Sequence, residues 1–142
     1  MAKSIKLKNE TYIDSSSVVH DRTTLNNILK DTGWRDIIFY SGFSDFADWT
    51  TCKARKIGDV IYIKGAVKGF SSINYTQFAK LPNDFRGNTD NTVQFIVPVI
   101  NKASTIAVLN IGMNTGIMVL TSANSSVSSS DGININCSFC LY

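Results

Sequence analysis

From Trp34 onward, short apolar runs alternate with segments rich in Gly, Asn, Asp and Ser. This rhythm predicts a mostly β domain, an antiparallel sandwich of jelly-roll-like type, with about seven or eight strands. The clearest strands are expected at residues 49–56, 60–67, 93–99, 105–113, 116–122 and 133–142.

The connections between these strands also carry turn signals. Ile57-Gly58-Asp59 predicts a hairpin turn, after which Ile61 and Ile63 share one face and the intervening residues share the other. Residues 114–116, Asn-Thr-Gly, predict a second hairpin. Residues 122–131 hold six serines, so we expect a loop at one end of the sandwich.

The first part of the chain has a different pattern, which divides the chain into residues 1–33 and residues 34–142. Residues 5–8 and 11–19 are expected to be extended and to form an arm. Asp21 is placed to cap a short helix that runs to Lys30, and Gly33 supplies its stop.

A helix this short needs a partner, because isolated helices below about 12 residues rarely persist in water. The spacing of its apolar residues is that of a brief coiled-coil seam, so three copies around one axis would cover them. The expected trimerisation residues are Val18, Leu25, Ile28 and Leu29. The alternative is a helix that folds onto its own domain.

Composition narrows the class of protein. Hydrophobic residues make up 44% of the chain and charged residues 18%, which argues against disorder. The net charge of +3 comes from 14 scattered Lys and Arg residues, so a nucleic-acid partner is not expected. The sequence contains no apolar stretch of about 18 residues and no signal core, and we therefore expect neither membrane insertion nor export.

Catalytic motifs are not evident. The single histidine, His20, lies in the N-terminal arm, no nucleophile motif frames a serine, and no glycine-rich loop has phosphate-binding spacing. We therefore expect no enzyme and no cofactor.

Two groups of residues were weighed as metal ligands. Cys137 and Cys140 have the spacing of a metal knuckle, and Cys52 with His20 would complete four ligands. Residues three apart in a strand point to opposite faces, however, so the two thiols should not converge. Asp45 and Asp48 lack the alternating ligands of a calcium loop, and a solvated turn is favoured for them. No metal site is predicted.

An aromatic segment at residues 34–49 suggests sugar binding, because sugar rings stack on aromatic faces beside polar groups. Trp34, Phe39 and Trp49 are expected in the core, since large aromatic residues dominate burial in small domains. The candidate receptor-binding residues are Tyr40, Phe43, Asp45, Phe46, Asp48 and Tyr75.

Three stretches of the sequence resemble a known group of proteins. Residues 4–22 resemble the N-terminal segment of tail, baseplate and fibre proteins from phages and prophages of low-GC Gram-positive bacteria. Residues 54–65, ARKIGDVIYIKG, resemble a hairpin of their minor structural and receptor-binding proteins, and residues 81–86, LPNDFR, resemble the step that follows it. Members usually continue with proline, whereas Gly87 stands here, which puts the conformation of this loop in doubt.

The resemblance implies a virion protein assembled in the bacterial host cytoplasm as a homotrimer. Its N-terminal segment would contact other virion proteins, and its β-head would contact the host surface, often a cell-wall saccharide. Two other functions stay open: a purely structural capsid or baseplate decoration protein, and a glycan-cleaving enzyme, which would need paired carboxylates in one cleft.

Overall fold

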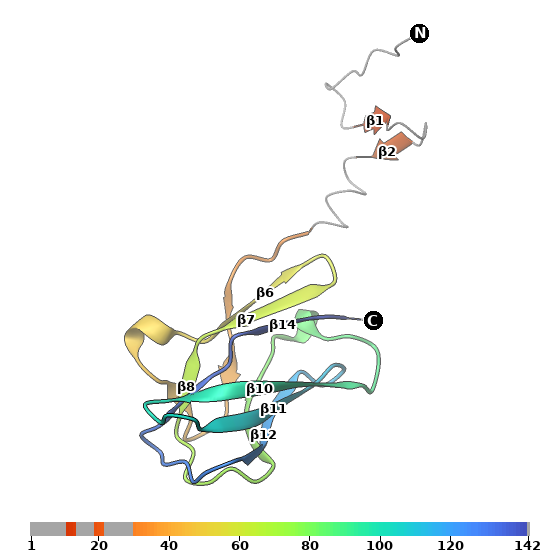
Figure 1. Cartoon of the computed structure of the whole chain (residues 1–142). Coiled ribbons are helices and arrows are strands. Elements are labelled where there is room, and N and C mark those ends of the chain that lie inside the picture. The colour runs from red at the N-terminus through yellow and green to blue at the C-terminus, as the bar shows by residue number, and fades with distance from the viewer. Residues whose placement is uncertain (1–10, 14–18, 22–29, 142) are drawn as a thin grey trace.

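The computed structural model describes residues 11–13, 19–21 and 30–141, which form antiparallel strands with two short 3-10 turns (Figure 1). The larger sheet contains eight strands, in the spatial order β4 (Ile38–Phe39), β9 (Thr76–Lys80), β12 (Ile117–Ala123), β11 (Ile106–Gly112), β10 (Thr92–Ile100), β13 (Gly132–Asn134), β8 (Ala66–Lys68) and β5 (Ser44–Asp45). The smaller sheet has the order β14 (Cys137–Cys140), β7 (Val60–Lys64), β6 (Lys53–Ile57) and β3 (Arg35–Asp36).

Alternation of apolar and polar residues places the core between the two sheets. On β11 every second side chain is buried, and on β12 Met118 and Leu120 are buried. On β7, Ile61 and Ile63 share one face, as predicted, and this face points into the core. An aromatic cluster lies within this core, where the ring of Phe43 is 4.9 Å from that of Phe70, and Phe70 is 5.4 Å from Phe78. The predicted β-sandwich class is therefore confirmed.

The two predicted hairpins are also confirmed. Residues 57–59 join β6 to β7, and residues 113–116 join β11 to β12. The serine-rich loop occupies residues 124–131, with Val127 buried. Gly87 donates its backbone N–H to the carbonyl of Met113 at 2.8 Å, a bond that a proline at this position would not make.

Three strand predictions were wrong in extent, and four strands of the β-domain lie outside the predicted ranges: β9 and the two-residue strands β3, β4 and β5. The predicted strand at 49–56 begins only at Lys53, because a 3-10 turn, η1 (Asp48–Thr50), precedes it. The predicted strands at 60–67 and 133–142 each break into two strands that belong to different sheets. Strand β9 was not predicted, since its sequence, TQFAK, has little apolar alternation.

In the N-terminal part, β1 (Thr11–Ile13) pairs with β2 (Val19–Asp21), with Tyr12 opposite His20. Asp21, expected as a helix cap, ends β2. The expected strand at 5–8, residues 22–29 of the helix expected to run to Lys30, and the trimerisation residues Val18, Leu25, Ile28 and Leu29 lie outside the described residues, and Lys30 itself is not helical.

Two of the four chain crossings between the sheets in the described part of the chain meet at one corner. The chain passes from β7 to β8 at Gly65, and from β13 to β14 at residues 135–136. Ile135 donates its N–H to the Gly65 carbonyl at 3.0 Å, and the Gly65 N–H donates to Oδ1 of Asn136 at 2.8 Å. Gly65 has φ of +124°, and a Cβ there would lie 2.6 Å from Cα of Cys52. Only glycine fits this corner without displacing backbone.

We expect Gly65→Ala to lower the free energy of unfolding by about 2–4 kcal/mol, because it adds backbone strain to a steric clash. Urea denaturation measures this change. Gly33→Ala is the matched control, since Gly33 also has positive φ (+66°) but has open space around the position of a Cβ. Its cost should be about 1 kcal/mol from the backbone alone. Equal losses for both variants would contradict the steric account of the corner.

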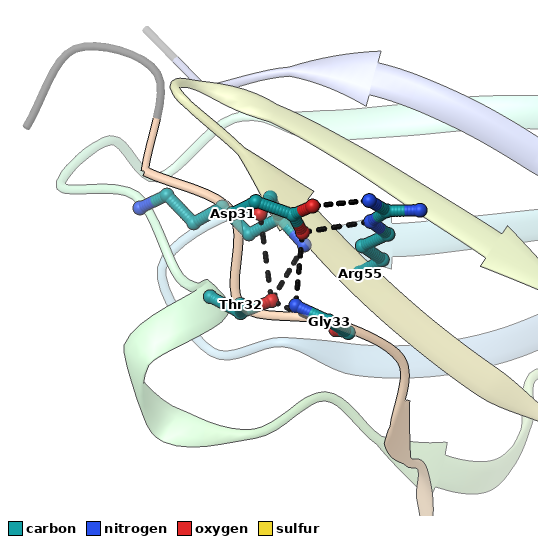
Figure 2. A network of polar contacts seen from close by, with 5 residues as sticks. Asp31, Thr32, Gly33 and Arg55 are labelled. Carbon is teal, nitrogen blue, oxygen red and sulfur yellow. Dashed lines mark hydrogen bonds and ion pairs between the residues drawn. The ribbon is translucent and has the colours of Figure 1, made fainter. Parts of the chain in front are cut away.

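Residues 30–33 are held along β6 by a network of polar contacts (Figure 2). Asp31 bridges to Ile57 in the β-ladder, and Thr32 donates its N–H to the Lys56 carbonyl at 3.0 Å. The Asp31 carboxylate accepts a bond from Nε of Arg55 at 2.7 Å, a second bond from that guanidinium, and one from the Gly33 N–H at 2.9 Å. These contacts fix the described start of the β-domain to the smaller sheet.

The Asp31 contacts make stability depend on pH. The hydrogen bonds from Arg55, and then that from Gly33, lower the pKa of Asp31 from 3.8 to about 2. A carboxylate with a lowered folded-state pKa stabilises the fold above its unfolded pKa, and that contribution is lost as pH falls through the folded value.

We therefore expect Asp31→Asn to be less stable than the parent protein at pH 7, with the difference shrinking between about pH 4 and pH 2. Thermal unfolding followed across this range measures the difference. Asp36→Asn is the control, because Asp36 makes a single exposed ion pair with Lys53 at 2.7 Å. A difference for Asp31→Asn that persists unchanged at pH 2 would reject the ionic account.

Candidate functional site

Trp49 borders a hollow of about 390 Å³ beside the corner where the chain crosses between the sheets. Its side chain is 79% exposed, the largest exposed fraction among the big apolar side chains of the described residues. The hollow is lined by Trp49, Thr50, Thr51, Lys64, Gly65, Ala66, Ile100, Asn134 and Asn136.

The chain holds Trp49 outward through a short, well-bonded turn. Thr50 Oγ1 accepts the Ala47 N–H at 2.9 Å and donates to the Ala47 carbonyl, which closes the 3-10 turn. On either side, the Phe46 N–H donates to the Ala66 carbonyl at 2.8 Å and the Cys52 N–H donates to Oδ1 of Asp45 at 2.6 Å. Both ends of the segment are therefore tied to the core, and Trp49 projects from a fixed base.

Two asparagines of the crossing strands form the opposite part of the lining. Asn136 uses Oδ1 to accept from Gly65, and Asn134 uses Oδ1 to accept the Asn136 N–H at 3.1 Å. Within the described part of the chain, neither side-chain NH₂ group donates to a protein acceptor, so both remain available as donors. The corner that closes the fold thus also orients two amides at the hollow.

Lys64 is the one ionisable residue among the described residues that line the hollow. Its ammonium lies over the ring of Trp34, 4.4 Å from the centroid, and the Arg55 guanidinium lies 5.9 Å from the same ring. These cation–π contacts hold positive charge on the outer side of the smaller sheet.

An exposed indole with adjacent amides and hydroxyls has the chemistry of a shallow polyol site. An indole face can stack on the apolar face of a sugar ring, and the NH₂ groups of Asn134 and Asn136, with the Thr51 hydroxyl, can donate hydrogen bonds to ring hydroxyls. Stacking and hydrogen bonding are the interactions that this lining offers.

The residues predicted for receptor binding do not form one site. Phe43 packs in the aromatic core, Asp45 binds the Cys52 backbone, and the Phe46 ring covers Gly132, where a Cβ would lie 2.7 Å from it. Tyr40 is half-buried and donates its N–H to the Phe78 carbonyl at 2.9 Å.

Asp48 and Tyr75 are the exposed members of the predicted set, and they lie apart. Asp48 begins the turn that carries Trp49. Tyr75 is 74% exposed and lines a different hollow, of about 270 Å³, on the larger sheet.

The predicted core positions of Trp34 and Trp49 were wrong, whereas Phe39 does pack against the core. Residue type alone suggested burial for all three. The sequence around Trp49 held a contrary signal, because Asp48, Thr50 and Thr51 make it an isolated apolar residue in a polar run.

The two C-terminal cysteines lie on opposite faces of β14, as predicted. Cys137 packs against the core, and Cys140 is exposed. Burial raises the pKa of Cys137 to about 12, and burial followed by the neighbouring Asp45 raises the pKa of the Cys52 thiol well above its usual range. Within the described ranges, no three His, Cys, Asp or Glu side chains cluster as metal ligands. Nor does any helix there have the length and apolarity to span a membrane.

We expect one fast and two slow thiols when the native protein is treated with Ellman's reagent at pH 8. A thiolate is the reacting species, and the raised pKa values of the buried Cys52 and the half-buried Cys137 keep both in the thiol form. Cys140→Ser should remove the fast phase, and Cys52→Ser, the control, should leave it unchanged. Three thiols of equal rate in the native protein would contradict the assigned burial.

Comparison with known proteins identifies the fold. No protein-family model matches the chain, and no curated protein sequence matches it significantly. Seven chains of solved structures do match, among them the crystal structure of the head domain of phage bIL170, published as a receptor-binding domain of lactococcal phages. The TM-score is 0.59 at 19% sequence identity, over 77% of this chain and 97% of that chain. The resemblance drawn from sequence is thus confirmed for the fold.

Proposed function

We propose that this chain is a structural component of a phage virion, in a tail, baseplate or head fibre, whose β-domain binds a saccharide of the host cell wall. The observation that carries the proposal is the exposed Trp49 at a hollow lined by amides and hydroxyls, on a fold shared with a phage receptor-binding head.

The geometry of the hollow favours binding over catalysis. A fixed turn on one side and the sheet corner on the other hold the lining in place before a ligand arrives, which reduces the entropy lost on binding. Glycoside hydrolysis by the usual route needs two facing carboxylates, and the described lining contributes Lys64 as its ionisable group.

The proposed assembly is a homotrimer in which residues 1–33 contact other virion proteins. A trimer would present several shallow hollows to one cell surface, and binding by linked sites multiplies a weak single-site affinity.

A purely structural decoration protein is the second candidate function. It is favoured by the small depth of the hollow and by the many ordered contacts that hold residues 30–33 to the domain. Such a protein would share the fold and have no affinity for host glycans.

We expect Trp49→Ala to weaken binding of purified wall polysaccharide by about tenfold or more, because the stacking face is lost. Calorimetric titration of the full chain, with polysaccharide fragments from a panel of lactococcal and related low-GC Gram-positive strains, measures the affinity. Tyr75→Ala is the matched control, since it removes an equally exposed aromatic ring from the larger sheet.

The outcomes separate the candidate functions. Loss of binding in Tyr75→Ala with retention in Trp49→Ala would reject the Trp49 hollow in favour of the other face. Lack of binding by the parent protein across the panel would reject receptor binding and leave the decoration role. Release of shortened glycans would indicate an enzyme.

A further inference from the structure

Three side-chain oxygens that line the hollow are already occupied inside the fold. Oδ1 of Asn136 accepts the Gly65 N–H at 2.8 Å, and Oδ1 of Asn134 accepts the Asn136 N–H at 3.1 Å. Oγ1 of Thr50 accepts the Ala47 N–H at 2.9 Å and uses its own proton on the Ala47 carbonyl. These amide and hydroxyl oxygens serve the backbone before any ligand arrives.

Two backbone carbonyls of the lining are occupied in the same way. The Gly65 carbonyl accepts the Ile135 N–H at 3.0 Å, and the Ala66 carbonyl accepts the Phe46 N–H at 2.8 Å. Among the described residues of the lining, the Thr51 hydroxyl is the one side-chain oxygen without a protein partner. The capacity of the lining side chains to accept a hydrogen bond is thus limited to one hydroxyl.

The donors of the lining, in contrast, remain free. Asn134 and Asn136 each carry an NH₂ group with two N–H bonds, and within the described chain neither group donates to a protein acceptor. The orientation of each amide follows from the fold, because Oδ1 faces the backbone N–H that it accepts and the NH₂ group takes the other position. The indole of Trp49 adds an N–H and has no lone pair to offer.

A cation lies at the margin of these donors. Lys64 lines the hollow, and its ammonium lies 4.4 Å from the centroid of the Trp34 ring, which is outside the lining. Like the amide NH₂ groups, an ammonium donates hydrogen bonds and cannot accept them. The free polar side chains of the described lining are therefore donors, and the Thr51 hydroxyl is the group that can also accept.

We propose that the hollow selects a sugar by an oxygen that accepts hydrogen bonds and carries no proton, and that Asn134 and Asn136 determine this specificity. Two kinds of substituent supply such an oxygen: the carbonyl of an acetamido group and the oxygens of an acid group. This inference rests on the proposed function, because it names the feature of the saccharide that the same hollow recognises.

The physical reason is the proton of a hydroxyl group. A sugar hydroxyl that accepts from an amide NH₂ still has its own proton to place, and the lining offers one free side-chain oxygen for it. A donor that leaves water without a new acceptor weakens binding. A carbonyl or acid oxygen has two lone pairs and no proton, so it can accept from both NH₂ groups without that loss.

The test is a nuclear magnetic resonance titration of the isotope-labelled full chain with matched methyl glycosides. The probes are the plain hexoside, the acetamido hexoside and the uronic acid, in the gluco and the galacto series. We expect the acetamido or the acid probe to bind about tenfold more tightly than the plain hexoside, the effect of two neutral hydrogen bonds. The same probe should shift the side-chain NH₂ signals of both Asn134 and Asn136.

Isosteric variants test the donors without removing the contacts of the corner. Asn136→Asp keeps the oxygen that accepts the Gly65 N–H, and Asn134→Asp keeps the corresponding oxygen, so only the NH₂ group is lost. Each variant should lower the affinity for the preferred probe at least about tenfold. Asn110→Asp is the matched control, since Oδ1 of Asn110 accepts from Gln94 at 2.9 Å on the larger sheet, outside this hollow.

Thermal unfolding of each variant checks that the fold is retained. Unchanged affinity in both hollow variants would overturn the proposal, as would a parent chain that binds the plain hexosides as tightly as the substituted ones or binds none of the probes.

The probes also separate the two sources of the acceptor oxygen. Affinity for an acetamido carbonyl should be independent of salt, whereas affinity for an acid should fall as salt rises, because the Lys64 ammonium lies beside the donors. A preference for the acid that disappears in Lys64→Met and persists in both asparagine variants would assign the selection to Lys64 and overturn the role of the amides.

Failure of this inference is distinguishable from failure of the proposed function. Equal binding of all probes that is lost in Trp49→Ala rejects the selection by donors and keeps saccharide binding at the hollow. Selective binding of a substituted glycoside, without binding of wall polysaccharide from any strain of the panel, rejects the host-wall function and keeps the selection.

Discussion

The corner at Gly65 is the constraint on which the two sheets and the candidate site depend. Two strand pairs cross between the sheets at this point, and the bonds from Ile135 to Gly65 and from Gly65 to Asn136 hold the crossings together. The absence of a Cβ lets the backbone approach Cys52, so the corner closes tightly. Asn136 accepts the hydrogen bond that ties the two crossings together, and it also lines the hollow. The same contact therefore fixes the corner of the fold and this part of the candidate site.

The outward face of the smaller sheet carries charged side chains, whereas strands β10–β12 of the larger sheet carry none. This difference follows from the segments that lie next to each sheet. Residues 31–34 run along the edge of the smaller sheet, next to β6. There Asp31 binds Arg55, and the ring of Trp34 contacts the ammonium group of Lys64. Strands β10–β12 are joined to each other by tight turns and receive no such charged segment. The outward faces of β10–β12 are therefore uncharged, whereas Lys53, Arg55 and Lys64 lie on the outward faces of β6 and β7.

Local patterns in the sequence predicted the parts of the fold that local interactions determine. Turn residues at 57–59 and 114–116, and alternation around Ile61 and Ile63, were sufficient to predict hairpins and inward faces. The crossings at Gly65 and residues 135–136 were not predictable, because an apolar run looks the same whether its two halves pair in one sheet or in two. The hollow at Trp49 was not predicted either, because the crossing at residues 135–136 is what brings Asn134 and Asn136 near Trp49. The sequence analysis placed Trp49 in the core on its residue type alone.

The exposure of Trp49 is the feature whose physical cost most needs an explanation. Burial of a large indole would stabilise the domain by about 2 kcal/mol, and the exposed Trp49 does not make this contribution. Other aromatic residues, Phe70, Phe78 and Phe85, are fully buried in the core. Hydrogen bonds from the Ala47 N–H to Thr50 and from the Cys52 N–H to Asp45 fix the 3-10 turn that carries Trp49. These contacts hold the indole ring at the surface. Single exposed apolar side chains are common on protein surfaces, so the exposure of Trp49 supports the proposed binding only together with the polar hollow that the ring borders. Under the proposed function, in which several copies act together, weak stacking at each ring would be sufficient, because linked sites reach high avidity together.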